Sequence, residues 1–194
     1  APGESRLEIL DQVVELLWDR PIRDLSIVTI MRGTGLSRPA FYQYFKNIPV
    51  LIEELLVDLE SEMNEAATAW FVTDGPAKQE IRQSLGGIID VCRSHGPVFR
   101  AISESAPHDA RLEAAWSKFM DSWDHSVEER ILKGQADGFY RACDAAMVAR
   151  ALNRMDAEIL IDGFGRRVQR DPEVVLETLY TIWSRTLLHP QYLD

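Results

Sequence analysis

Residues 37–46 place hydrogen-bonding, cationic and aromatic side chains in close succession. An arginine such as Arg38 can bind both acceptors on the major-groove edge of guanine, and a small residue such as Ala40 can touch a thymine methyl. Hydroxyl and ammonium groups, such as those of Tyr42 and Lys46, reach phosphates and position a protein on the duplex. The segment therefore has the chemistry of a DNA contact. The residues expected to make it are Ser37, Arg38, Pro39, Ala40, Tyr42, Gln43, Tyr44 and Lys46.

A second group of side chains is aromatic and lies at helical spacing. Trp116, Phe119, Met120 and Trp123 occur at i, i+3, i+4 and i+7, which places them on one continuous face of a helix. Such a face either belongs to a core or lines an apolar pocket, in which a few polar groups orient a ligand. The spacing alone leaves both interpretations open.

Catalytic and metal-binding arrangements find no comparable support. His125 has acidic neighbours at helical spacing that could complete half a metal site, but a solvated helix face explains them better. The pair Gly86-Gly87 lacks the surroundings of a phosphate-binding loop or a dinucleotide fingerprint. No serine has the context of a nucleophile elbow. We therefore expect no catalytic residue, no metal ion and no cofactor, and we expect that the protein is not an enzyme.

The elements that carry these side chains are predicted to be helices throughout. Apolar residues recur three and four positions apart nearly everywhere, and no alternating stretch is long enough to indicate a strand. Capping residues, glycines and prolines set the boundaries. The helical ranges expected are about 5–19, 26–32, 37–45, 47–71, 77–94, 97–105, 108–135, 144–166 and 172–188. The chain should thus be all-α, with about nine helices.

Residues 26–45, SIVTIMRGTGLSRPAFYQYF, have the pattern of a helix-turn-helix. A short helix, a turn that contains Gly35 and a second short helix follow one another, and the second helix of such a motif reads the major groove. The side chains expected to fix the angle between the two helices are apolar: Ile27, Ile30, Leu36 and Phe41.

The charge is unevenly distributed along the chain. The net charge of −10 is the wrong sign for a general nucleic-acid binder. Residues 1–50 are neutral, however, and the stretch from Arg20 to Ile48 holds five bases and one acid. A small basic region on an acidic body favours specific docking on DNA over indiscriminate coating of nucleic acid.

The segment SRPAFYQYF, followed by a long helix, resembles the TetR family of transcriptional repressors, most specifically over Leu25–Phe45. SKFM with Trp123, ALNRM at 151–155 and IW at 182–183 are similar to the ethionamide-repressor subgroup of that family. This weaker similarity extends over nearly the whole chain. It implies a DNA-binding domain at residues 1–48 and a helical ligand-binding and dimerisation domain at residues 49–194.

The resemblance also implies a ligand tunnel. Asn153 is the polar residue expected to bind a ligand carbonyl, and the subgroup has an asparagine where this chain has Asp156. The residues expected to line the tunnel are Ile81, Leu85, Ile88, Trp116, Phe119, Met120, Trp123, Asn153, Asp156 and Trp183.

The last two expected helices correspond to the dimer interface of the family. The residues expected on the apolar face are Met147, Ala151, Met155, Leu176, Leu179 and Ile182. The alternative is a monomer in which these two helices only close their own core. A two-fold dimer would read two half-sites, whereas one helix-turn-helix makes few contacts.

These expectations combine into a ligand-responsive transcriptional regulator, expected to be a repressor, that binds operator DNA as a homodimer and is released by a small apolar ligand. The alternative is an all-helical carrier or enzyme that does not bind DNA.

No apolar run is long enough to cross a bilayer, and Cys92 and Cys143 have no disulfide-framework spacing, which indicates two buried thiols in a reducing compartment. The expected location is therefore the cytoplasm.

Overall fold

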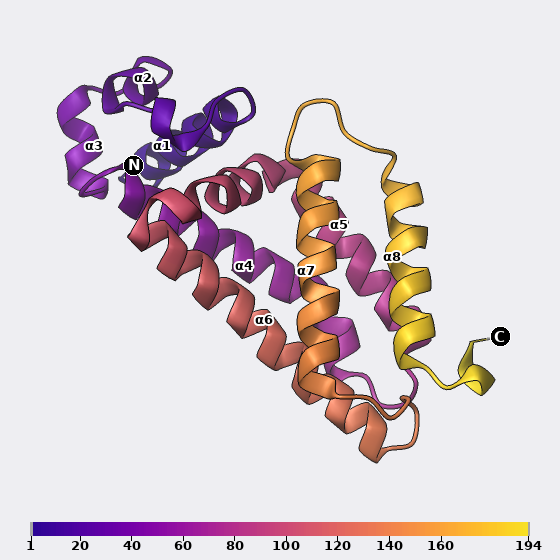
Figure 1. Cartoon of the computed structure of the whole chain (residues 1–194). Coiled ribbons are helices and arrows are strands. Elements are labelled where there is room, and N and C mark those ends of the chain that lie inside the picture. Colours follow the sequence, from indigo (N-terminus) through magenta and orange to yellow (C-terminus); the bar gives the residue numbers. More distant parts are fainter. Residues whose placement is uncertain (1, 194) are drawn as a thin grey trace.

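Eight α-helices and three 3-10 turns make up residues 2–193, the part of the chain that the computed structural model describes (Figure 1). The helices are α1 (Pro2–Leu17), α2 (Ile27–Arg32), α3 (Arg38–Tyr44), α4 (Ile48–Val72), α5 (Lys78–Ser105), α6 (Ala110–Ala136), α7 (Ala145–Phe164) and α8 (Pro172–Leu187). The 3-10 turns are η1 (Ile22–Asp24), η2 (Ala106–His108) and η3 (Pro190–Tyr192). The expected all-α class is confirmed.

Helices α1, α2 and α3 form a small domain at one end of the molecule (Figure 1). Helix α2 begins because the Ser26 side chain accepts the backbone N–H of Thr29 at 3.1 Å. Ser37 occupies the corresponding position before α3, although its side chain makes no capping bond. Ile30 and Phe41 are completely buried, and they fix α2 against α3 as a helix-turn-helix requires.

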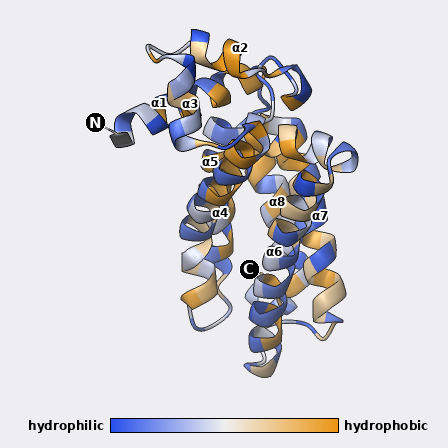
Figure 2. Cartoon of the chain, turned by 90° about the vertical axis from the view of Figure 1, so that its left-hand side faces the viewer, coloured by the Kyte–Doolittle hydropathy of each residue, from blue (hydrophilic) through white to orange (hydrophobic). Residues whose placement is uncertain are grey.

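Helix α4 carries the chain from this domain into the larger helical body. It begins where the side chain of Asn47 accepts the backbone N–H of Val50 at 3.0 Å. In the body, α5 packs against α4, α7 and α8, and it also contacts α1 of the small domain. Figure 2 shows orange and blue residues along the same helices, as expected of amphipathic helices that surround a shared core.

The sequence predicted two helices where the structure has one, α5. Pro97 was expected to end the first of them, but it lies inside a continuous helix. Proline has no N–H with which to bond the carbonyl four residues earlier, that of Arg93. The side-chain amide of Gln169 donates to this carbonyl instead, at 2.9 Å. Gly96 lets the backbone of Phe164 approach, since a Cβ there would lie 2.2 Å from the Phe164 oxygen.

The expectation that Leu176 and Leu179 belong to an exposed dimer face is wrong. Both side chains are buried within the chain, and Leu179 has no exposed surface. Helix α8 packs on α5, and its inner stripe at spacings of three and four is the one that the sequence pattern detected. Met147 and Val174, in contrast, are exposed on α7 and α8.

The two cysteines are unpaired. Cys92 is buried as expected, whereas Cys143 is only partly buried. Among the described residues, no helix combines the length and the apolar character that a membrane span requires.

Candidate DNA interface and ligand cavity

Helix α3 has one buried and one exposed side. Phe41 and Phe45 are buried in the small domain, and this fixes which side chains point outward. Ala40 and Tyr44 are partly buried against that core. The other predicted DNA-contacting side chains are exposed: Ser37, Arg38, Pro39, Tyr42, Gln43 and Lys46. The exposed side of α3 and the residues at its two ends therefore carry most of the predicted contacts.

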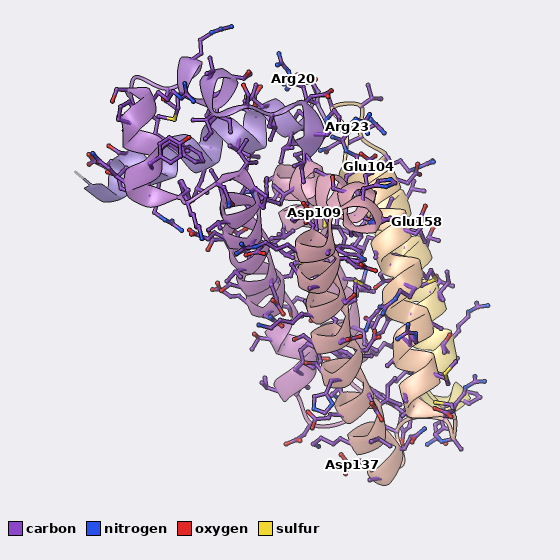
Figure 3. All side chains as sticks on the ribbon, turned by 60° about the vertical axis from the view of Figure 1, so that its left-hand side comes forward. Arg20, Arg23, Glu104, Asp109, Asp137 and Glu158 are labelled. Carbon is purple, nitrogen blue, oxygen red and sulfur yellow. The ribbon has the colours of Figure 1, made fainter. Side chains whose placement is uncertain are left out.

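The bases of the small domain do not form a single surface. Among residues 2–193, Arg38 and Lys46 have no ion-pair partner, which leaves both charges available to a phosphate or a base. Figure 3 shows Arg20 and Arg23 at the end of the domain that borders the α7–α8 connection. The neighbouring Asp19 pairs there with Arg167 at 2.9 Å. The local positive charge seen in the sequence is therefore divided between the two ends of α3 and the border with the α7–α8 connection.

The body contains a cavity between α4, α5, α6, α7 and α8. Its volume is about 60 Å³, counted as the space open to the centre of a water molecule, and this is room for several waters. Asp109 and Asp137 cap the two ends of α6 (Figure 3), and the cavity lies along the middle of that helix. The lining residues are Met63, Ala67, Trp70, Phe71, Ile81, Ser84, Leu85, Ile88, Phe99, Phe119, Met120, Trp123, Val127, Asn153, Asp156, Ala157, Leu160 and Trp183.

The structure brings nine of the ten predicted ligand residues to this cavity. The exception is Trp116, whose ring lies 5.8 Å from that of Phe119 and 5.2 Å from that of Phe99. It supports the wall from behind instead of lining it. The aromatic stripe on α6 therefore divides between one packing residue, Trp116, and three lining residues, Phe119, Met120 and Trp123.

Helix α4 provides a wall of the cavity that was not predicted from the sequence. Met63, Ala67, Trp70 and Phe71 line the cavity, but none of them is among the residues expected to line the tunnel. Three of them lie at spacings of four and three, the same signal that identified the stripe on α6. Phe99 of α5 was missed because the expected helix break at Gly96-Pro97 separated it from the rest of that helix.

Asn153 is oriented by an ion pair outside the cavity. Its amide nitrogen donates to Asp124 at 2.9 Å, and Arg154 binds the same carboxylate at 3.1 Å. The carboxylate therefore fixes which end of the amide is nitrogen. An asparagine amide has two N–H groups and one acceptor oxygen, so one N–H and the oxygen remain for a ligand.

Asp156 is the only titratable residue among those that line the cavity. The indole N–H of Trp183 lies 3.0 Å from both of its carboxylate oxygens, and Asp156 has no ion pair in the described chain. Burial raises the pKa of Asp156 from its ordinary value of 3.8 to about 7, and the bond from Trp183 opposes this only in part. A carboxyl group thus sits in a wall whose other polar groups are uncharged.

Two further polar groups lie at the cavity: the hydroxyl of Ser84, which has hydrogen-bond partners, and the indole N–H of Trp123, which has none among residues 2–193. Ser84 donates to the carbonyl of Ala67 at 3.1 Å and accepts the backbone N–H of Trp70 at 3.3 Å. The indole N–H of Trp123 is buried and has no partner among residues 2–193. An unpaired buried donor is costly, and an acceptor on a ligand would relieve that cost.

The cavity wall is connected directly to the small domain. Phe99 lines the cavity, and the next residue, Arg100, is buried and donates to the backbone oxygen of Leu17 at 2.6 Å. Leu17 is the last residue of α1, where carbonyls are not used by the helix itself. Arg167 adds a second connection through Asp19. Movement of α5 would therefore be transmitted to α1.

The candidate metal pair on α6 is on the surface. His125 lies 3.4 Å from Glu129, and both side chains are about 70% exposed. The part of the chain that the structure describes contains no group of three potential metal ligands.

Comparisons with known proteins match both halves of the molecule. Residues 9–55 match the family "Bacterial regulatory proteins, tetR family", and residues 81–188 match "Transcriptional regulator EthR, C-terminal domain". The regulator EthR of Mycobacterium tuberculosis is 30% identical over 191 residues, which is 95% of this chain and 88% of the relative. EthR of Mycolicibacterium smegmatis is 26% identical over 197 residues, with 95% and 87% covered.

Solved structures show the same fold. The TetR-family regulator PfmR of Thermus thermophilus has a TM-score of 0.77 at 16% identity, covering 93% of this chain and 99% of its own. The two family matches and the EthR relative at 30% identity overturn the alternative of a carrier or enzyme that does not bind DNA. The chain belongs to the TetR family of helix-turn-helix transcriptional regulators, and its C-terminal domain is of the EthR type.

Proposed function

We propose that this protein is a homodimeric repressor that binds operator DNA through α3 and leaves it when a small apolar ligand occupies the cavity. The observation that carries this proposal is the position of Phe99 and Arg100. Phe99 lines the cavity, and its neighbour Arg100 donates a hydrogen bond to the backbone oxygen of Leu17 at the end of α1. We assign residues 1–48 to DNA binding and residues 49–194 to ligand binding and dimerisation. A regulator of this kind acts in the cytoplasm, where its DNA is.

The proposed release is a shift between two arrangements of the same dimer. A ligand that needs more space than the empty cavity offers would favour an arrangement in which α5 is displaced. Through Arg100 and Leu17 this displacement reorients α1, and α2 and α3 move with it because they share its core. The spacing between the two copies of α3 would then no longer fit successive major grooves.

The proposed dimer interface is the exposed side of α7 and α8. Met147 and Val174 are 62% and 63% exposed there. Ala151 is exposed on the same helix as Met147, and Met155 and Ile182 are partly buried. Exposed apolar side chains at this spacing suit a helical interface between two copies.

The decisive experiment is a gel shift with DNA from upstream of the gene that encodes this chain. We expect a dimer to bind one fragment specifically, in the presence of excess random DNA, and an apolar ligand that raises the melting temperature to release it. Failure to bind any upstream fragment above the level of random DNA would contradict the proposal. So would a ligand that stabilises the protein but leaves its affinity for the operator unchanged, because the cavity would then not control DNA binding.

A further inference from the structure

The cavity contains one carboxyl group without a cationic partner. Asp156 lines it, accepts the indole N–H of Trp183 with both oxygens, and makes no ion pair within residues 2–193. A charge on a partly buried side chain at an apolar cavity is expensive unless it is paired. Either the group is protonated in the empty protein or a positive charge arrives with the ligand.

The walls around this carboxyl are aromatic. Three indoles and three phenyl rings line the same cavity, and the ring of Trp70 lies edge-on, 5.3 Å from that of Trp183. The ring faces of aromatic side chains attract cations, and this attraction grows when water is excluded. The cavity thus offers a positive group both a carboxylate and several rings.

The charged and titratable side chains nearest the cavity form no ion pair with Asp156 among residues 2–193. Helix α6 contributes Asp124, which Arg150 and Arg154 of α7 already neutralise. Helix α5 contributes Cys92, whose thiol stays protonated because burial, and then the charge of Asp156, raise its pKa. Helix α4 lines the cavity only with apolar side chains, and α8 contributes the Trp183 indole.

We propose that the cavity selects a ligand with an apolar body and a positively charged amine, and that the amine pairs with Asp156. This inference rests on the proposed function, because it specifies the ligand of the same cavity. The raised pKa of Asp156, about 7, means that an arriving cation displaces a proton and converts the carboxyl to carboxylate near neutral pH.

Two other ligand classes fit the cavity less well. A carboxylate ligand would place a second negative charge beside Asp156, and like charges disfavour each other strongly in an apolar site. A neutral amide could accept a hydrogen bond from protonated Asp156 through its carbonyl oxygen, but it would leave the carboxylate form without a counter-ion. The direction of the pH dependence separates the cases: an amine should bind more tightly as pH rises, and an amide should bind less tightly.

The test compares three probes that share one alkyl chain: decylamine, decanamide and decanoate. Binding to the full dimer is measured by calorimetry at pH 6 and pH 8, for the wild type, Asp156→Asn, and the control Asp121→Asn. The control removes the same charge from an exposed position on α6. The amine stays protonated at both pH values, so changes in its affinity report on the protein.

We expect decylamine to bind wild type at least tenfold more tightly than decanamide at pH 8, with decanoate weakest. Because the pKa of Asp156 is about 7, the affinity of wild type for decylamine should fall by about tenfold from pH 8 to pH 6. Asp156→Asn should abolish both the preference and the pH dependence, and Asp121→Asn should preserve them.

If decanamide or decanoate binds tightly, and Asp156→Asn does not change the relative affinities of the three probes, this inference is wrong. The proposal that the cavity binds a ligand would still stand. If none of the three probes binds wild type, the proposal that the cavity binds an apolar ligand fails, and this inference fails with it.

Discussion

Replacing Asp156 by asparagine should stabilise the ligand-free protein, by an amount that grows as the pH rises from about 4 to about 7. Asparagine has nearly the same shape and can still accept the N–H of Trp183 through its oxygen. It differs from aspartate in that it never ionises. The substitution therefore isolates the cost of a carboxylate in the cavity.

The sign follows from the raised pKa. Between the ordinary value of 3.8 and about 7, the folded protein holds a proton on Asp156 that the unfolded chain has released. The free energy of unfolding of wild type therefore decreases with pH across this window and levels off above pH 7. In the variant this contribution is absent, so the two proteins are equally stable near pH 4 and differ most at pH 8.

The full difference in pKa corresponds to about 4 kcal/mol. Water that enters the cavity would solvate the carboxylate and reduce the effect to about 2 kcal/mol, still a shift of several degrees in melting temperature for a chain of this length. The measurement is thermal unfolding at fixed protein concentration from pH 5 to pH 8. This range avoids the Asp19–Arg167 pair, because that pairing lowers the pKa of Asp19 below its ordinary value.

Asp121→Asn serves as the control and should follow the wild-type curve. Parallel curves for wild type and Asp156→Asn, or a variant that is less stable at pH 8, would refute the reasoning. Either result would mean that the carboxylate is already stabilised in the empty cavity.

The remaining predictions concern DNA, assembly and coupling. Arg38→Ala should weaken binding to the cognate operator by about 1–3 kcal/mol and barely affect random DNA in a filter or gel assay; equal losses would mean that Arg38 touches only phosphate. Lys46→Ala should weaken binding to all sequences and reduce the slope of affinity against salt by about one, and an unchanged slope would remove it from the phosphate contacts. Met147→Glu should yield monomers in sedimentation, whereas a stable dimer would place the interface elsewhere. Arg100→Met should reduce the factor by which operator DNA changes ligand affinity, and an unchanged factor would mean that coupling bypasses Leu17.

The sequence alone predicted the helices well because their signals are local. Ser26 and Asn47 cap helices through their own side chains, and apolar spacing identifies the buried side of each helix. The continuous α5 was missed because its stability across Pro97 depends on a distant residue. Gln169 replaces the missing bond, and nothing near Pro97 in the sequence indicates this.

Spacing also identified the inner stripe of α8 but not its role. Leu176 and Leu179 are apolar at helical spacing, as both a core and a dimer face require. Only the packing of α8 on α5 decides between the two. Residues of a dimer face therefore have to be sought among exposed side chains such as Met147, and these can be identified only once the fold is known.

The chemistry of the cavity depends on partners that spacing does not reveal. Asn153 and Asp156 lie three residues apart on the same helix, and the sequence suggested similar roles for both. In the structure Asn153 is held by a carboxylate that two arginines neutralise, whereas Asp156 faces the cavity with only an indole as its partner. The first arrangement fixes the orientation of an amide, and the second leaves a charge to be balanced. We therefore expect aspartate in place of asparagine at position 156 to change which ligands the cavity accepts without changing the fold that surrounds it.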